Sequence, residues 1–452
     1  MPNSKSQAAS KAEYQRMMHW PIPKLLLSLS LPTMGSMLIT SLYNLADTLF
    51  VSRLGTQATG AVGITFSLMA LIQAIGFTLG MGGGSLISLQ LGRKAVRCAS
   101  DIASVSFALA LLCGLLVATG IFWREPIMCL LGATESILPY ALDYSFFIFL
   151  AAPLMTGALC LTHLLRAEGK TAHVLITITF SGLLNILLDA LLVAPLGVRG
   201  ISLATFVSQG LALFLLLSPY LKGKTSLQPT IPSFGQIASH AVSILTNGLP
   251  SLLRQGLAAV SAILLSRSAR LYGDAAVAAM SIAGKIFMIP FTLMLGYGQG
   301  LQPLIGFNFA KKNTRRIRRA AHFCLWTGTA ALTLLGFLLF WQAPKLVQLF
   351  STDTAVMQIA SYSLRASALT LPLLPACSIA NLGFQAIRRP LTASFLAAAR
   401  QGLFFIPLLL LLPGLWGVQT AQALADAATF ALSLPFLIYF LRKAVDNRLG
   451  KV

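Results

Sequence analysis

Long apolar segments recur along the whole chain and limit what it can fold into more than any other feature. Each is close to or above the roughly 20 residues that a helix needs to cross the hydrocarbon core of a bilayer. Only 10% of the 452 residues are charged, whereas soluble domains carry about 25%. The pattern predicts an all-α polytopic membrane protein with twelve transmembrane helices. The predicted spans are 24–53, 58–90, 99–122, 136–164, 171–194, 199–220, 237–270, 275–308, 319–341, 355–386, 391–412 and 417–441.

The loops between these segments carry most of the positive charge. Residues 1–19 are polar and basic and contain no apolar core of the kind that a signal peptide needs, so we expect the N-terminus in the cytosol. Most Lys and Arg then fall in inside loops and tails, as the positive-inside rule requires. The loops predicted to lie outside hold only Arg53, Arg124, Arg199, Arg267, Arg270 and Lys345.

This distribution explains the net charge of +21 as a determinant of topology. The expected partner is therefore the lipid bilayer and not nucleic acid, and both termini are predicted to be cytosolic. The six cysteines show no CxxC or other metal-ligand spacing, so we interpret them as packing residues.

The chain also repeats itself at a constant offset. Leu31 and Pro32 fall on Leu249 and Pro250, and the glycine-rich second span falls on the eighth. Because the offset covers six spans, an even number, the halves are predicted to be parallel repeats that form two pseudo-symmetric six-helix bundles. The predicted organisation is a cytosolic tail (1–23), an N-lobe (24–220), a cytosolic linker (221–236), a C-lobe (237–441) and a second cytosolic tail (442–452).

A group of oxygen-bearing residues falls inside the spans of the N-lobe. Asp47 lies in the first span, where a carboxylate at the helix centre costs roughly 2.5–3.5 kcal/mol and normally faces protein or water. Asp189 is predicted at similar depth, four residues after Asn185 on one helix face, and Thr205 at comparable depth in the sixth span. Such a set suits a hard cation or a shared proton, since close carboxylates resist double ionisation. It is a candidate proton- or sodium-coupling site; a structural hydrogen-bond network is the alternative.

The C-terminal half lacks this acidic pair and carries other polar residues in its spans. Charges at that depth need partners or water. Together with two residues near Asp47 in the first span, these polar residues are candidates for lining a substrate cavity. A structural role is the alternative. The candidates are Tyr43, Asn44, Arg254, Gln255, Lys285, Gln299, Arg400 and Asp426. In the first span, Pro32 removes a backbone hydrogen bond and is predicted to let the helix bend.

Several stretches, taken together, resemble one transporter family over nearly the whole chain. They are SLYNLADTLFVSRLG, LRAEGKT, NILLDALL with GISLAT, and GYGQGLQPLIGFNFAKKN. These resemble the multidrug and toxic compound extrusion (MATE) transporters, and RQGLFFIPLL with Gln302–Pro303 is most similar to the bacterial MepA-like branch. The resemblance implies a drug/cation antiporter with an ion site at Asp47, Asn185, Asp189 and Thr205. Unlike members with acidic residues in the seventh and tenth spans, this chain has Gln255 in the seventh and none in the tenth, so no C-lobe cation site is implied.

The sequence therefore predicts an ion-coupled antiporter of a bacterial inner membrane. It is expected to export amphipathic, often cationic organic compounds by alternating access, as a monomer without a resident cofactor. A flippase for a lipid-linked precursor is the runner-up, because it can share the two-bundle plan. An enzyme is disfavoured, because His163 and Glu168 lie near the cytosolic face without a Ser/His or His/Asp constellation.

Overall fold

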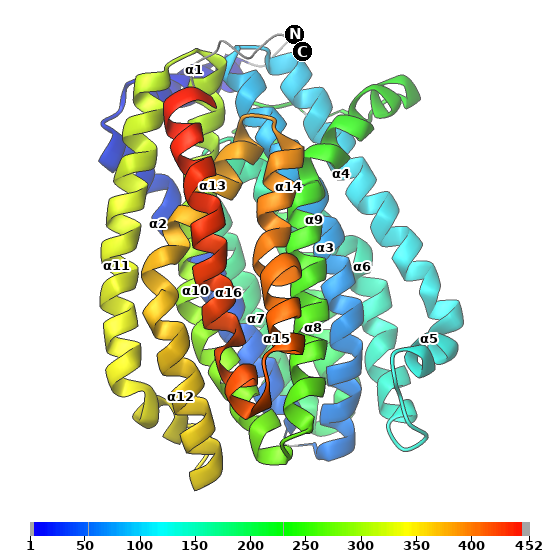
Figure 1. Cartoon of the computed structure of the whole chain (residues 1–452). Coiled ribbons are helices and arrows are strands. Elements are labelled where there is room, and N and C mark those ends of the chain that lie inside the picture. The colour runs from blue at the N-terminus through cyan, green and yellow to red at the C-terminus, as the bar shows by residue number, and fades with distance from the viewer. Residues whose placement is uncertain (1–3, 53, 229, 445–452) are drawn as a thin grey trace. The chain divides into compact units, whose positions relative to one another are not determined.

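A computed structural model describes residues 4–52, 54–228 and 230–444, and within them the chain is helical with no strand (Figure 1). Two short segments, η3 and η4, are π-helical. The elements are α1 (Ser4–His19), α2 (Ile22–Ser52), α3 (Thr56–Gly92), α4 (Val96–Ala118), η1 (Thr119–Trp123), α5 (Arg124–Leu130), α6 (Leu138–Ala167), α7 (Thr171–Leu196), α8 (Val198–Leu221), α9 (Phe234–Arg270), α10 (Asp274–Ala310), α11 (Thr314–Gln348), α12 (Thr354–Thr370), η2 (Leu371–Leu373), α13 (Leu374–Ala386), α14 (Pro390–Ala398), η3 (Ala399–Phe405), α15 (Ile406–Leu411), α16 (Gly414–Tyr439) and η4 (Phe440–Ala444).

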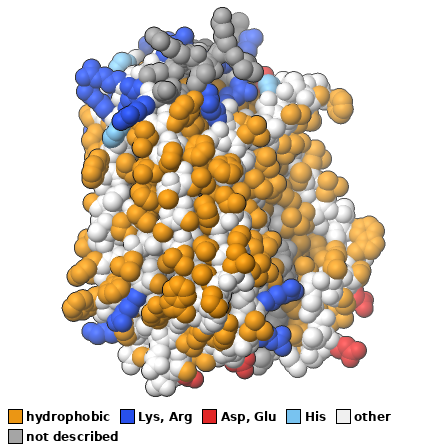
Figure 2. All heavy atoms as spheres, viewed as in Figure 1, with side chains coloured by type: hydrophobic (Ala, Val, Ile, Leu, Met, Phe, Trp, Pro, Cys, Tyr) orange, Lys and Arg blue, Asp and Glu red, His pale blue; other side chains and the backbone are white. Residues whose placement is uncertain are grey.

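The predicted number and type of spans are confirmed. In the described residues, twelve helical stretches are long and apolar enough to cross a membrane. Figure 2 shows hydrophobic side chains over most of the visible face, with Lys and Arg most numerous near the end where Figure 1 marks the termini. The chain is a multi-pass membrane protein.

Several spans extend further than their hydropathy predicts. The third runs over Val96–Leu130 and the ninth over Thr314–Gln348, against predictions of 99–122 and 319–341. A helix satisfies its own backbone hydrogen bonds, so it can continue beyond the apolar stretch into polar surroundings. Hydropathy therefore marks the apolar part of each helix rather than its ends.

The polar N-terminal tail contains a helix, α1, that packs on the loops of the first half. Met17 is fully buried. Arg16 Nη1 donates to the carbonyl oxygen of Gly169 at 3.3 Å, and Lys94 Nζ lies 4.9 Å from the ring centroid of Tyr14. Its position is thus set by contacts with the α6–α7 and α3–α4 turns.

By internal packing, the chain divides into two units. Unit 1 comprises Met1–Trp20 and Gly35–Leu252, and unit 2 comprises Pro21–Met34 and Leu253–Val452. The division falls inside α2 and α9, shortly after Pro32 and Pro250. The first part of each of these helices therefore packs with the helices of the other half of the chain.

Equivalent close helix contacts occur in both units. In unit 1, α3 lies so near α9 that a Cβ atom at Gly82 would overlap the carbonyl oxygen of Ile244. In unit 2, a Cβ atom at Gly300 on α10 would overlap the Ser30 side chain on α2. The shift that carries Pro32 onto Pro250 also carries Gly82 onto Gly300, so one contact recurs at the predicted repeat spacing. Both positions require glycine because backbones or short side chains approach closely.

The linker 221–236 is held along unit 1 by side chains of α4 and of the α6–α7 turn. The Ser226 N–H donates to Glu168 Oε2 at 3.1 Å. Further bonds run to α4: Gln228 N to Ser100 Oγ (3.0 Å), Thr230 N to Ser104 Oγ (2.9 Å) and Gln236 Nε2 to Asp101 Oδ1 (3.0 Å). These contacts fix the described linker residues to the first half of the chain.

We expect the free energy of unfolding to depend on pH through Glu168. Burial raises the pKa of this carboxyl from its ordinary 4.5 to about 7, although Tyr220, the backbone N–H groups of Ser226 and Leu227, and Lys170 oppose the shift. The folded protein thus binds this proton more tightly than the unfolded chain. Protonated Glu168 therefore adds to the free energy of unfolding below pH 4.5. This contribution, at most about 3 kcal/mol, is lost as the pH rises to about 7.

Glu168→Gln should remove this loss, because glutamine keeps an oxygen for the Ser226 N–H without a charge. The Tm of the purified variant should exceed that of the unmodified protein at pH 8 and match it near pH 5. Glu135→Gln, an exposed change, is the control. A Tm difference that is the same at both pH values would contradict the expectation.

Candidate functional site

Four helices of unit 1 (α2, α3, α7 and α8) bring polar side chains to one small cavity. Asp47 comes from α2, Asn185 from α7 and Thr205 from α8, and all three line the cavity. Its volume is about 20 Å³, enough for one water molecule or one bare cation. Tyr43 and Asn44, which are one helical turn before Asp47, line it as well.

Asp189 lies next to this cavity, and its carboxyl group adjoins that of Asp47. Asp189 is fully buried and Asp47 is 8% exposed. Asn185 and Asp189 are four residues apart on α7, so they share one face of the helix. The structure thus brings together Asp47, Asn185, Asp189 and Thr205, the four residues proposed from the sequence.

The polar atoms of this group are buried but only partly bonded. Among the described residues, neither oxygen of Asp189, Oδ1 of Asp47, nor either amide atom of Asn185 has a hydrogen-bond partner. The Thr205 hydroxyl donates to the carbonyl oxygen of Ile201 at 3.2 Å, which leaves its own oxygen as an acceptor. Buried groups of this kind are costly unless a proton or cation satisfies them, and their hard oxygen atoms suit either.

Four further polar residues at the cavity were not found from the sequence. They are Gln73, Ser181, Ser208 and Gln209. Helical spacing could have indicated Ser181, four residues before Asn185, and Gln209, four after Thr205. Gln73 lies in an apolar stretch of α3, and only the packing of α3 within unit 1 reveals its position.

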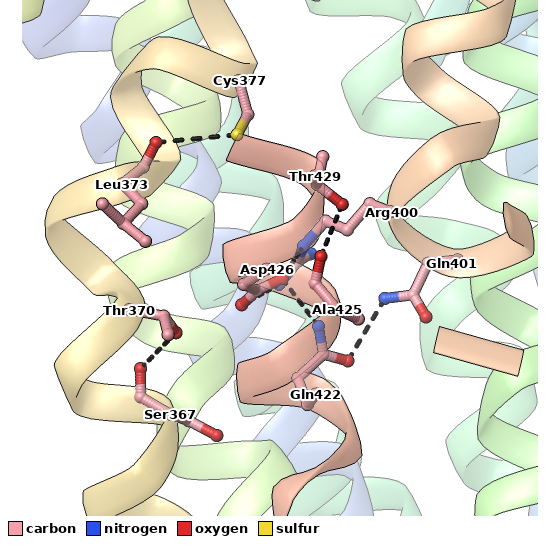
Figure 3. Close-up of polar contacts among 10 residues, drawn as sticks. All are labelled: Ser367, Thr370, Leu373, Cys377, Arg400, Gln401, Gln422, Ala425, Asp426 and Thr429. Carbon is pink, nitrogen blue, oxygen red and sulfur yellow. Dashed lines mark hydrogen bonds and ion pairs between the residues drawn. The ribbon is translucent and has the colours of Figure 1, made fainter. Parts of the chain in front are cut away.

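In unit 2, Arg400 and Asp426 form a buried ion pair. Arg400 Nε lies 2.7 Å from Asp426 Oδ1, with side-chain exposures of 15% and 0%. Gln422 donates to the same oxygen at 2.9 Å, and Gln401 donates to Gln422 at 3.5 Å. Figure 3 shows Arg400 reaching from η3 to Asp426 on α16. The guanidinium also lies 4.2 Å from the ring centroid of Phe291, so pairing and a cation–π contact stabilise its charge.

The other cavity candidates of the second half lie in separate surroundings. Arg254 is half-buried and donates to Asn381 Oδ1 at 3.3 Å. It occupies the position equivalent to Ser36, which accepts a bond from Arg166 at 2.6 Å in unit 1. In each unit, an arginine hydrogen bond thus connects the first span of a repeat to its fourth span. Among the remaining candidates, Gln299 is buried, Gln255 is half-buried and Lys285 is exposed.

His163 and Glu168, the residues considered for an enzyme, lie in different surroundings. Within the described ranges, no group of three or more His, Cys, Asp or Glu side chains could hold a metal ion. His163 packs its ring 5.0 Å from that of Phe77, whereas Glu168 binds the linker.

A twelve-span helical protein with a buried carboxylate pair in one unit has the features of a membrane transporter. The MatE family model matches residues 32–191 and 250–411. The chain therefore belongs to the MatE family. The two matched segments begin at Pro32 and Pro250, a pair of residues that the repeat in the sequence aligns with each other.

Curated relatives and solved structures agree with this assignment. The chain is 26% identical over 435 residues to the multidrug export protein MepA of Staphylococcus saprophyticus, covering 95% of this chain and 94% of that protein. It is 27% identical over 408 residues to the FAD transporter of Shewanella oneidensis, covering 86% and 87%.

Among solved structures, the crystal structure of MATE in complex with MaL6 has a TM-score of 0.89 and 23% identity, covering 96% and 98%. A MOP superfamily transporter from Pyrococcus furiosus, described as having a reverse polarity of its binding pocket, has a TM-score of 0.85 and 23% identity, covering 94% and 98%. These likenesses show the MATE fold. The curated relatives are named as transporters.

Proposed function

We propose that this protein is an ion-coupled antiporter of a bacterial inner membrane that exports amphipathic, often cationic organic compounds by alternating access. The proposal takes its direction and cargo from relatives named as multidrug export proteins that match over nearly the full chain. The coupling ion is a proton or sodium.

The adjoining carboxyl groups of Asp47 and Asp189 carry the ion-coupling part of this proposal. Both are buried, and the carboxylates cannot both stay ionised at low cost so close together. A proton shared between them, or a sodium ion held with the oxygens of Asn185 and Thr205, would satisfy the unbonded atoms. An ion that binds and leaves here changes the charge of unit 1, as coupling requires.

Helix α2 provides a route from ion binding to a change of conformation. Asp47 packs in unit 1, whereas Pro21–Met34 of the same helix packs in unit 2. Pro32 lies near the division and lacks the backbone N–H that would stiffen this turn. A change in packing around Asp47 would therefore reach unit 2 through the backbone of a single helix. Linkage then requires that drug binding weakens ion binding by the same factor.

Relatives with different names raise a question about the cargo, because one is named as an exporter of drugs and the other as a transporter of FAD. The negative charges of FAD would call for uncompensated cations. Of the residues proposed to line a substrate cavity, Arg400 is already neutralised by Asp426 in unit 2, whereas unit 1 has the acidic Asp47 and Asp189 at or beside its cavity. This distribution of charge favours cationic or neutral amphipathic cargo.

The test is transport by purified protein in lipid vesicles loaded with a fluorescent cationic dye, with a pH gradient or a sodium gradient imposed alone. One gradient should drive dye movement at least about tenfold above the rate without a gradient. FAD in place of the dye should give little transport. Dye movement that neither gradient accelerates would overturn ion coupling, and transport of FAD but not of dye would overturn the cargo.

A further inference from the structure

A second pocket lies entirely within unit 2, at the turn between α13 and α14. Its volume is about 430 Å³, more than twenty times that of the Asp47 cavity. The turn lies at the upper end of α14 in Figure 1, beside α13 and α16. The lining residues are Phe384, Arg389, Thr392, Pro435, Phe436 and Tyr439.

The walls of this pocket are aromatic and well supported. Phe384 stacks on Tyr439 with ring centroids 6.4 Å apart and planes 14° apart. It also meets Phe436 edge-on, with the centroids 6.3 Å apart. Rings that pack on each other keep their positions, so the pocket has firm apolar walls.

The polar groups of the pocket are the cation of Arg389 and the hydroxyls of Thr392 and Tyr439. Arg389 is half-buried, and no carboxylate in the described part of the chain forms an ion pair with its guanidinium. Thr392 lies one turn further along and adds its hydroxyl. An unpaired guanidinium recognises phosphate well, because its planar N–H groups can form two parallel hydrogen bonds to one anion.

The equivalent corner of unit 1 is closed by the chain itself. There, Gly169 takes the place of Arg388, and both have positive φ (83° and 61°). This pairing is one residue longer than the shift that carries Pro32 onto Pro250, and it also brings Tyr220 onto Tyr439. In unit 1 the carboxyl of Glu168 and the linker residue Ser226 fill this corner. The second repeat has Ile387 at the position of Glu168, and its corner remains a pocket with a cation at the edge.

The surroundings of the pocket suit the boundary between headgroups and acyl chains. Arg389 belongs to a basic turn that, with Lys311 and Lys312, is predicted to face the cytosol. Next to it, apolar side chains of α14 and α16 are exposed: Leu391 (80%), Phe395 (44%), Leu434 (39%) and Ile438 (42%). In a membrane, such side chains contact acyl chains, and Tyr439, at the end of α16, is expected near the interface, where tyrosine is enriched.

We propose that this pocket binds an anionic phospholipid of the cytosolic leaflet, with the headgroup phosphate on Arg389 and Thr392 and the acyl chains along α14 and α16. The placement in that leaflet depends on the predicted orientation of the chain. Basic pockets between spans on the cytosolic side commonly receive anionic headgroups. The C-terminal residues 445–452 complement the pocket poorly, because they carry Arg448 and Lys451 against one acid, Asp446.

The experiment measures lipid binding to the purified full-length protein after exchange into a neutral detergent. Phosphatidylglycerol and phosphatidylcholine with identical acyl chains are added separately, and bound lipid is counted by native mass spectrometry. Both lipids carry the phosphate, but in phosphatidylcholine the quaternary ammonium competes with Arg389 for its negative charge. Loss of a charge-assisted bond to this competition costs about 1.5–3 kcal/mol, so phosphatidylglycerol should bind at least about tenfold more tightly. Arg389→Gln should remove this preference. Arg388→Gln, which removes the same charge from the neighbouring exposed residue, should retain it.

Thr392→Phe should also weaken phosphatidylglycerol binding, because it fills the pocket and leaves Arg389 in place. Unchanged Tm values in phosphatidylcholine would show that the variants fold. Equal binding of the two lipids, or equal losses in Arg389→Gln and Arg388→Gln, would overturn the proposal. So would displacement of the lipid by inorganic phosphate alone at matched concentration, or a pocket that binds lipid only after residues 445–452 are removed.

Discussion

Asp47→Asn is expected to abolish ion-driven efflux while the protein remains folded. Asparagine has nearly the same shape as aspartate, but it cannot take up and release a proton or supply a charged oxygen to sodium. Asp47 adjoins Asp189 in a buried site, and a neutral water molecule in the small cavity cannot replace the charge of the lost carboxylate. Dye efflux from vesicles under the driving gradient should fall at least about tenfold, to the rate measured without a gradient. The Tm should change little.

Two further variants make this expectation specific. Asp189→Asn should have a similar effect, and the double variant should be no worse than either single one, because the two carboxyl groups act as one site. Asp143→Asn is the control: it removes an acid of the same unit whose ion pair with Arg199 is largely exposed, and it should leave efflux near normal. Full efflux by Asp47→Asn would refute a shared coupling site. So would a double variant whose fold-loss of efflux equals the product of the losses in the two single variants.

Gly82→Ala is expected to destabilise the protein more than other glycine-to-alanine changes in the same helix. The added Cβ would overlap the carbonyl oxygen of Ile244 and lie 2.9 Å from the backbone nitrogen of Gly248. Both are backbone atoms, so no side-chain rotation can make room and α3 must move away from α9. Overpacking typically costs about 1–3 kcal/mol, which for a chain of 452 residues corresponds to a Tm lower by roughly 1–3 °C. Efflux should fall with it.

Gly63→Ala is the matched control, because it lies on the same helix and a Cβ atom there meets nothing within 4 Å. Its Tm should be unchanged or slightly higher, since alanine favours the helix. If the two variants had the same Tm and efflux, the close approach of α3 and α9 would not be needed in the folded protein.

Hydropathy alone was enough to determine the number and type of the spans. A helix in lipid must bury its backbone polar groups internally, so an apolar run of sufficient length has one stable form. The helix α1 was not found in this way, because it is polar and its place depends on Met17 and Arg16 meeting the α6–α7 turn. The ends of the third span were also missed, because helical hydrogen bonding continues past the apolar residues.

The sequence by itself determined which residues could form the ion site. An acid inside an apolar run is rare and costly, so Asp47 and Asp189 stand out, and helical spacing joins Asn185 to Asp189. Only the tertiary structure decided that Asp47 and Asp189 adjoin, that Gln73 faces the same cavity, and that Arg400 is paired with Asp426. Depth along a span follows from position in the sequence, but the rotation of each helix about its axis follows from packing against neighbours distant in the chain. The same packing leaves the corner at Arg389 open in unit 2, while Glu168 and Ser226 close its counterpart in unit 1.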